Sequence, residues 1–143
     1  MSSRLVIESP DETIELGSDN ITGVIYESDT PDDSNARATD IGSSMIIKGK
    51  IITAVDGSEA DDTRKIAIWS LVKAESADAY RDATLETIAA DQVIRKINFP
   101  NAFVVDYTET FDHSQGVGQF ELVLRQKKDR NELVSIEGGY AAE

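Results

Sequence analysis

Residues 94–128 read IRKINFPNAFVVDYTETFDHSQGVGQFELVLRQKK, and this stretch decides the fold. Apolar and polar residues alternate with a period of two over residues 103–108 and again over residues 119–125. The segment that joins the two runs, residues 112–118, contains two glycines. Two alternating runs around a glycine-containing loop are typical of a β-hairpin. Just before the hairpin, Pro100-Asn101 predicts a turn that ends a shorter strand.

Alternation also predicts which hairpin side chains share a face of the sheet, because successive side chains of a strand point to opposite faces. The residues expected to share one face are Phe103, Val105 and Tyr107 in the first run and Phe120, Leu122 and Leu124 in the second.

A single helix is predicted over residues 63–75, with Asp61, Asp62 or Thr63 as its cap. Side chains three or four residues apart lie on the same side of a helix. Four residues here share one side, and two more extend the apolar surface beside them. The common set is Ile68, Leu71, Val72 and Glu75, and the two further residues are Ile66 and Trp69, of which Trp69 is assigned to the core.

Shorter apolar or alternating runs predict the remaining strands, at residues 4–9, 13–16, 21–27, 45–55, 81–88 and 133–136. The predicted fold is therefore mainly β with one α-helix. It is an antiparallel β-barrel or sandwich of about eight strands, flanked by the helix, in a single domain over residues 1–143. Gly138-Gly139 predicts the start of a loose tail.

Residues 28–44, SDTPDDSNARATDIGSS, contain one large apolar residue and predict a long loop. Loops of this length within a compact domain are usually functional or disordered.

The composition excludes several classes of function. A net charge of −13 argues against nucleic acid as a partner, because phosphate binding needs clustered Lys and Arg. The absence of cysteine excludes disulfides and thiolate metal sites. No apolar run is long enough for a membrane span, and the first residues do not read as a signal peptide. Synthesis and assembly in the cytoplasm are expected, with export as part of an injection machine left open.

No catalytic residue, cofactor or metal site is predicted. His113 is the only histidine, and its neighbour Ser114 lacks the orienting acid that a catalytic triad needs. Two acidic clusters contain the oxygen ligands that calcium prefers, but neither has the spacing of a known calcium loop. These clusters are Asp29, Asp32 and Asp33, and Asp56, Glu59, Asp61 and Asp62.

Charge is distributed unevenly and suggests contacts between copies of the chain. Residues 1–62 carry a net charge of −10, and residues 63–143 carry −3. A basic run follows the last strand of the hairpin, and an acidic loop of a neighbouring copy could pair with it. The candidate interface residues are Asp29, Asp32, Asp33, Arg37 and Asp40 in the loop, and Arg125, Lys127, Lys128 and Arg130 in the basic run. Solubility alone also accounts for the acidity.

The region from Ile66 to Asp129 resembles a known family. It contains IAIWSLVKAES in the helix, followed by INFPNAFVVDYTETFDHSQGVGQFELVLRQKKD. The second segment has a basic residue, FPNA, a VV-x-Y-x-E strand, a glycine-containing turn and a strand that ends in basic residues. This pattern resembles the tube-forming proteins of contractile injection machines, namely haemolysin-coregulated protein (Hcp) of type VI secretion systems and the tail tube proteins of phages.

The resemblance implies a small β-barrel with a flanking helix, six copies in a ring, and rings stacked into a hollow tube without catalytic activity. It also implies that residues 28–44 form an arm to a neighbouring subunit, and that sheath proteins, baseplate proteins and cargo effectors are partners. A monomeric β-sandwich binding module that uses calcium at its acidic loops is the alternative, and the oligomeric state separates the two.

Overall fold

A computed structural model describes residues 1–29, 42–52 and 61–142 of the chain. Its strands are β1 (Ser2–Glu8), β2 (Thr13–Leu16), β3 (Ile21–Asp29), β4 (Gly42–Ile51), β5 (Arg81–Ala89), β6 (Gln92–Asp112), β7 (Val117–Gln126), β8 (Ser135–Glu137) and β9 (Tyr140–Ala141). Its helices are α2 (Thr63–Trp69) and the 3₁₀ segments η1 (Ala77–Ala79) and η2 (Lys128–Leu133). The predicted fold class, antiparallel β with one α-helix, is confirmed for the described residues.

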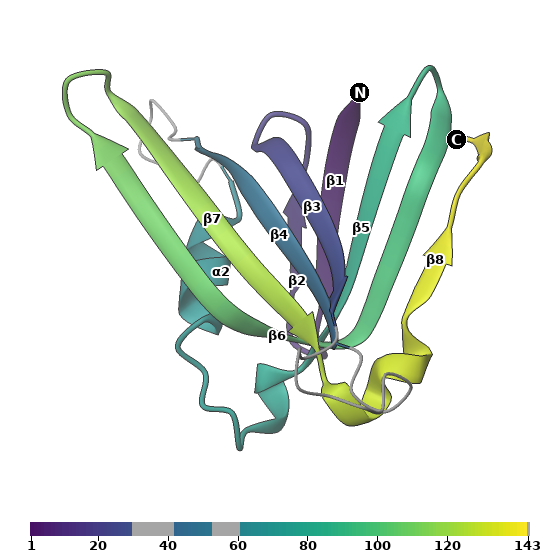
Figure 1. The fold of residues 1–143 in the computed structure, drawn as a ribbon. Coiled ribbons are helices and arrows are strands. Elements are labelled where there is room, and N and C mark those ends of the chain that lie inside the picture. The colour runs from purple at the N-terminus through teal and green to yellow at the C-terminus, as the bar shows by residue number, and fades with distance from the viewer. Residues whose placement is uncertain (30–41, 53–60, 143) are drawn as a thin grey trace.

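All nine strands belong to one antiparallel sheet in the order β2-β1-β5-β6-β7-β4-β3, with β8 and β9 attached to β6. Within the described ranges no ladder joins β2 to β3, so hydrogen bonds do not close the sheet into a barrel. Figure 1 shows the two halves of the sheet rising from a common base, with β6 running through both.

β6 is 21 residues long and passes through Pro100 and Asn101 without the predicted turn, so that prediction is wrong. The pair instead marks the place where β6 changes partners. Ala102 pairs with Arg81 of β5 on one edge and with Gln126 of β7 on the other. The Gln126 side chain accepts a 2.9 Å hydrogen bond from the Asn101 amide, and the Lys127 amide donates to the Asn101 carbonyl. Proline lacks a backbone donor and suits this transition.

The core lies between the two halves of the sheet. Its largest fully buried side chains come from both halves and from the helix, and they include Leu5, Ile14, Met45, Ile47, Ile66, Trp69, Phe99, Leu122 and Leu124. Burial of one such aliphatic or aromatic side chain stabilises the fold by about 1.5–3 kcal/mol.

The hairpin prediction is confirmed, because Asp112 pairs with Val117 across the predicted loop. The face assigned to β7 is also confirmed, since its three apolar residues, Phe120, Leu122 and Leu124, are buried. In β6 the prediction that Phe103, Val105 and Tyr107 share one face is wrong, because a bulge shifts the register between Val104 and Asp106. Val104 and Tyr107 pack against the core, whereas Val105 is 47% exposed.

The helix is shorter than predicted and uses a different face. It ends at Trp69, where the amides of Leu71 and Val72 bond carbonyls three residues earlier and tighten the chain. Its buried residues are Thr63, Ile66 and Trp69, whereas Ile68 is 50% exposed and Leu71 is 82% exposed. Of the predicted apolar surface, Ile66, Trp69 and Val72 pack in or against the core, whereas the prediction was wrong for Ile68 and Leu71. None of the described helices is long and apolar enough to cross a membrane.

The C-terminal segment is ordered along β6 and is not a loose tail. The predicted strand near Ile136 is present as β8. Beyond Gly138-Gly139 the chain continues as β9, where Tyr140 pairs with Val93. In Figure 1 this segment follows the first half of β6 at the outer side of the sheet.

Candidate subunit interfaces

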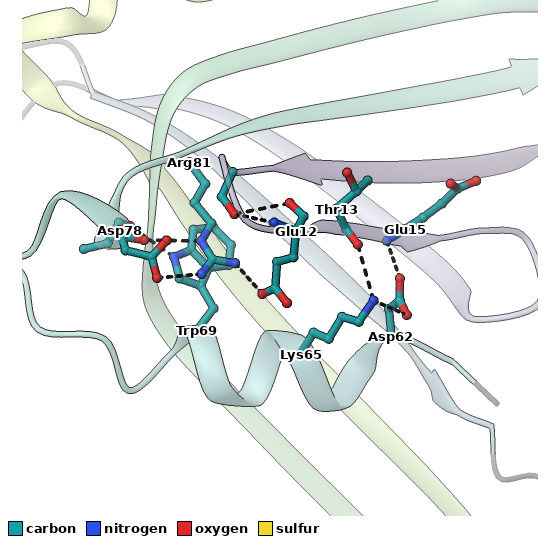
Figure 2. A network of polar contacts seen from close by, with 10 residues as sticks. Glu12, Thr13, Glu15, Asp62, Lys65, Trp69, Asp78 and Arg81 are labelled. Carbon is teal, nitrogen blue, oxygen red and sulfur yellow. Dashed lines mark hydrogen bonds and ion pairs between the residues drawn. The ribbon is translucent and has the colours of Figure 1, made fainter. Parts of the chain in front are cut away.

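The β2 end of the sheet is sealed by side chains of α2. The Glu15 amide donates to the Asp62 carboxylate at 2.9 Å, and the Lys65 ammonium donates to the Thr13 carbonyl at 3.5 Å. Lys65 and Asp62 also form an ion pair at 3.3 Å (Figure 2). An exposed strand edge is a template for pairing with another chain, and here two of its backbone groups, the Glu15 amide and the Thr13 carbonyl, have side-chain partners. Asp62 and Lys65 therefore lie across the β2 edge, where a second strand would have to pair.

Arg81 fixes the segment after α2 to the turn between β1 and β2. Its side chain is 6% exposed and forms ion pairs with Asp78 at 2.8 Å and Glu12 at 3.0 Å. The guanidinium also lies over the Trp69 ring, 5.2 Å from its centroid, and the indole N–H donates to the Ala79 carbonyl. In Figure 2 the Trp69 ring lies against the flat face of the Arg81 guanidinium, and the carboxylates of Asp78 and Glu12 bond its edges. The geometry uses both the fork and the flat face of arginine, which lysine does not offer.

Two long stretches of strand edge carry no strand partner among the described residues, besides the short outer sides of β8 and β9 and the start of β1. The first is the outer edge of β3, called here the β3 edge. The second is the side of β6 opposite β7 over residues 103–112, called here the arm edge. Both segments lack Lys and Arg and carry acids. The acids are Glu27 and Asp29 on β3, and Asp106, Glu109 and Asp112 on the arm.

The tip of the β6–β7 hairpin is rigidly built and displays apolar residues. The Asp112 carboxylate accepts hydrogen bonds from the Ser114 hydroxyl at 2.7 Å and from the Ser114 amide at 3.0 Å. These bonds lower the pKa of the Asp112 carboxyl, with the bond from the hydroxyl as the largest cause. Gly116, at φ +68°, completes the turn. Nearby, Phe111 is 57% exposed and Val117 is 37% exposed, so the tip offers a small apolar surface.

The predicted interface residues fall at one end of β4 as far as the structure describes them. Asp29 pairs with Gly42 at that end, and Arg125 pairs with Ser44 and donates to its hydroxyl at 3.3 Å. Lys127 lies 5.2 Å from the Tyr80 ring centroid, and Lys128 and Arg130 are exposed in η2. The fold thus brings Asp29 and the basic run to the same end of the sheet. The other loop candidates, Asp32, Asp33, Arg37 and Asp40, lie outside the described residues.

The second acidic cluster has structural roles where it is described. Asp61 accepts bonds from the Thr63 amide at 3.1 Å, from the Asn20 side chain at 2.8 Å and from the Ile52 amide at 2.6 Å, and so joins the start of α2 to the end of β4. Asp62 seals β2. Asp56 and Glu59 lie outside the described residues, and within the described part no three His, Cys, Asp or Glu side chains gather as metal ligands. In the hairpin turn the Ser114 hydroxyl bonds Asp112 and not His113, which is exposed.

No family model matches the sequence, and no curated protein matches it. Solved structures do match the fold. Hcp1 from Flavobacterium johnsoniae superposes with a TM-score of 0.58 at 19% identity, over 100% of both chains. The chain has the fold of Hcp1. A chain of the anti-feeding prophage baseplate gives a TM-score of 0.55 at 10% identity, over 95% of this chain and 92% of that chain. The predicted resemblance to Hcp is therefore confirmed at the level of the fold.

The sequence did not predict which edges of the sheet are covered by side chains and which are open. Local alternation identifies a strand but not its neighbours, which come from pairing between distant segments. One signal was present in the sequence: the β3 and arm segments both lack basic residues.

Proposed function

We propose that this protein is a structural subunit that assembles with copies of itself into rings of six, and that the rings stack into the hollow inner tube of a contractile injection machine. The observation that carries this proposal is that some edges of the sheet are covered and others are open. Side chains seal the β2 edge, whereas the β3 edge and the arm edge carry no strand partner among the described residues. Natural proteins usually protect exposed edges, so open ones suit a protein that pairs with further copies.

Six-fold closure of the ring is supported by two considerations. The anti-feeding prophage baseplate, whose chain shares this fold, was solved with 6-fold symmetrisation. An interface between two different patches of one subunit closes into a ring when the rotation between neighbours permits it.

Within this proposal, the basic residues Arg125, Lys127, Lys128 and Arg130 contact the acidic segment of residues 28–44 of a neighbouring copy. The first and last residues of this predicted loop belong to β3 and β4. Sheath proteins, baseplate proteins and cargo effectors are the further partners, and the function needs no catalytic residue. Assembly takes place in the cytoplasm, before export of the tube. The calcium-dependent binding module is less well supported, because Asp61 and Asp62 are already used by the fold.

The proposal is tested by light scattering after size-exclusion chromatography, followed by negative-stain electron microscopy of the same fractions. Rings or hollow filaments are expected, and a monomer at every concentration would refute the proposal.

A matched pair of variants tests the hairpin tip. Replacing Phe111 with Ser should weaken association by about 2 kcal/mol, roughly 30-fold, because exposed aromatic residues at interfaces contribute most of the binding energy. Replacing Leu71 with Ser is the control, since Leu71 is 82% exposed and lies on neither open edge. Circular dichroism should show that both variants are folded. Equal assembly of the two variants would exclude the tip as a contact.

A further inference from the structure

The charges of the open edges create a problem for assembly. The β3 edge and the arm edge both carry acids and neither carries a base. Like charges directly opposite each other destabilise a strand pair. The two open edges are therefore poor partners for each other, and the acidic β3 edge needs a basic edge as its complement.

One basic edge exists, and the chain's own C-terminal segment covers it. Residues 92–98 of β6, QVIRKIN, contain Arg95 and Lys96 and no acid. The side of this segment opposite β5 is occupied by residues 134–142, called here the C-terminal strap. The strap pairs Glu137 with Lys96 and Tyr140 with Val93. Beyond Asn101 the same side of β6 is paired with β7.

The strap is held almost entirely by its backbone. Every residue of β8 and β9 is exposed, including Ile136 at 53% and Tyr140 at 40%. Only Val134, at its root, packs against the core cluster. The Gly139 amide donates to the Val93 carbonyl at 2.8 Å, and the Ala142 amide donates to the Asp91 carbonyl at 2.9 Å. An extended strand of another copy could form regular ladder bonds with β6 in place of these backbone bonds.

The β3 edge of a second copy matches the strap in chemistry. The strap places one acid, Glu137, opposite Lys96. β3 offers Glu27 and Asp29 in an extended strand that has no partner on its outer side among the described residues. Lys96 also lies opposite Glu86 of β5. A β3 strand in place of the strap would again put an acid on the other side of Lys96.

We propose that the C-terminal strap is a removable cover of the basic edge of β6, and that the β3 edge of a second copy replaces it when the protein assembles. This inference rests on the proposed self-assembly and adds a mechanism that regulates it. The strap keeps the newly made chain from pairing, and its release exposes the complement of β3.

A disulfide that ties the strap down provides the test, because the chain contains no cysteine of its own. Gln92 and Ala141 are directly paired, and both are exposed. Partners in an antiparallel pair have Cα atoms about 4.5–5.5 Å apart, within the range that a disulfide spans. The locked protein is therefore Gln92→Cys with Ala141→Cys. The control is Ser3→Cys with Thr87→Cys, which joins β1 to β5, where the two hydroxyls already lie 2.9 Å apart.

Both double variants are purified in full length, oxidised or reduced, and followed by light scattering and electron microscopy. The oxidised strap variant should remain monomeric and should assemble after reduction, whereas the control should assemble in both states. Assembly of the oxidised strap variant to the level of the control, or no gain on reduction, would overturn the strap inference and leave the proposed function intact. Failure of the wild-type protein and the control to assemble would instead refute the proposed function.

Charge reversal tests the identity of the replacing strand. Glu27→Lys should weaken assembly, because it would place a base opposite Lys96 in the exchanged pair. Assembly of Glu27→Lys to the wild-type level would exclude β3 as the replacing strand.

Discussion

Replacing Trp69 with Ala should destabilise the fold by about 3–5 kcal/mol. The Trp69 side chain is 2% exposed, and an aromatic residue buries about 150–250 Å² on folding. At about 25 cal/mol per Å² this area is worth about 4–6 kcal/mol, and partial collapse of the cavity recovers some of it. The substitution also removes the donor to the Ala79 carbonyl and the ring beneath Arg81.

Urea unfolding followed by far-UV circular dichroism measures this loss. Fluorescence cannot serve, because Trp69 is the only tryptophan. For a chain of this size the expected loss corresponds to a fall in Tm of about 6–20 °C. The control is Leu71→Ala, two residues along the same segment, where 82% exposure predicts a change within about 0.5 kcal/mol. A Trp69 effect below about 1 kcal/mol, or a Leu71 effect of equal size, would refute the assignment of the buried face.

Two further predictions concern turns and close packing. Gly49→Ala should cost about 1–3 kcal/mol in urea unfolding, because a Cβ there would lie 2.2 Å from the Asn20 carbonyl oxygen. Gly17→Ala, where a Cβ meets nothing within 4 Å, should change little. By NMR, the Asp112 carboxyl should titrate below the usual range of aspartate, and Ser114→Ala should raise its pKa. Because the folded-state pKa is lowered, the stabilisation is present above the unfolded pKa and is lost as the pH falls through the folded pKa. An unchanged Asp112 titration in the Ser114 variant would contradict this cause.

The sequence predicted what depends on local pattern. Alternation located the hairpin and the buried face of β7, because a regular strand keeps its period of two. The same reasoning failed on β6, where a single bulge after Val104 moves the following side chains to the other face. It also failed at Pro100, because local propensity signals a break, whereas the strand continues there with a new partner on each side.

The helix shows why spacing and hydrophobicity alone can assign the wrong residues to the buried face. Leu71 is the more obvious core residue by hydrophobicity, yet the helix ends before it at Trp69. The end is fixed by tertiary contacts, namely the indole bond to Ala79 and the stacking of Arg81, which lie 10 and 12 positions further along the chain. Such contacts leave no periodic signal in the helix itself.

The candidate interfaces could be predicted only in part, because edges are a property of the whole sheet. The sequence identified the basic run at Arg125 and the acid at Asp29, and the fold places both at one end of β4. It did not indicate that the C-terminal residues would return to β6, because Gly138-Gly139 is equally typical of a tail. In the structure, a Cβ at Gly138 would lie 2.0 Å from the Ile94 carbonyl oxygen, so the glycine permits the close approach of the strap.

In the proposed assembly, the different edges of the sheet explain how pairing between copies could be delayed. Asp62 and Lys65 lie across the β2 edge. The β3 and arm edges are open but acidic, so two copies that meet through them repel each other. The edge that carries Arg95 and Lys96 would attract them, and it lies under the strap. Pairing between copies is then limited by one reversible step, the release of a segment whose side chains contribute almost nothing to the core.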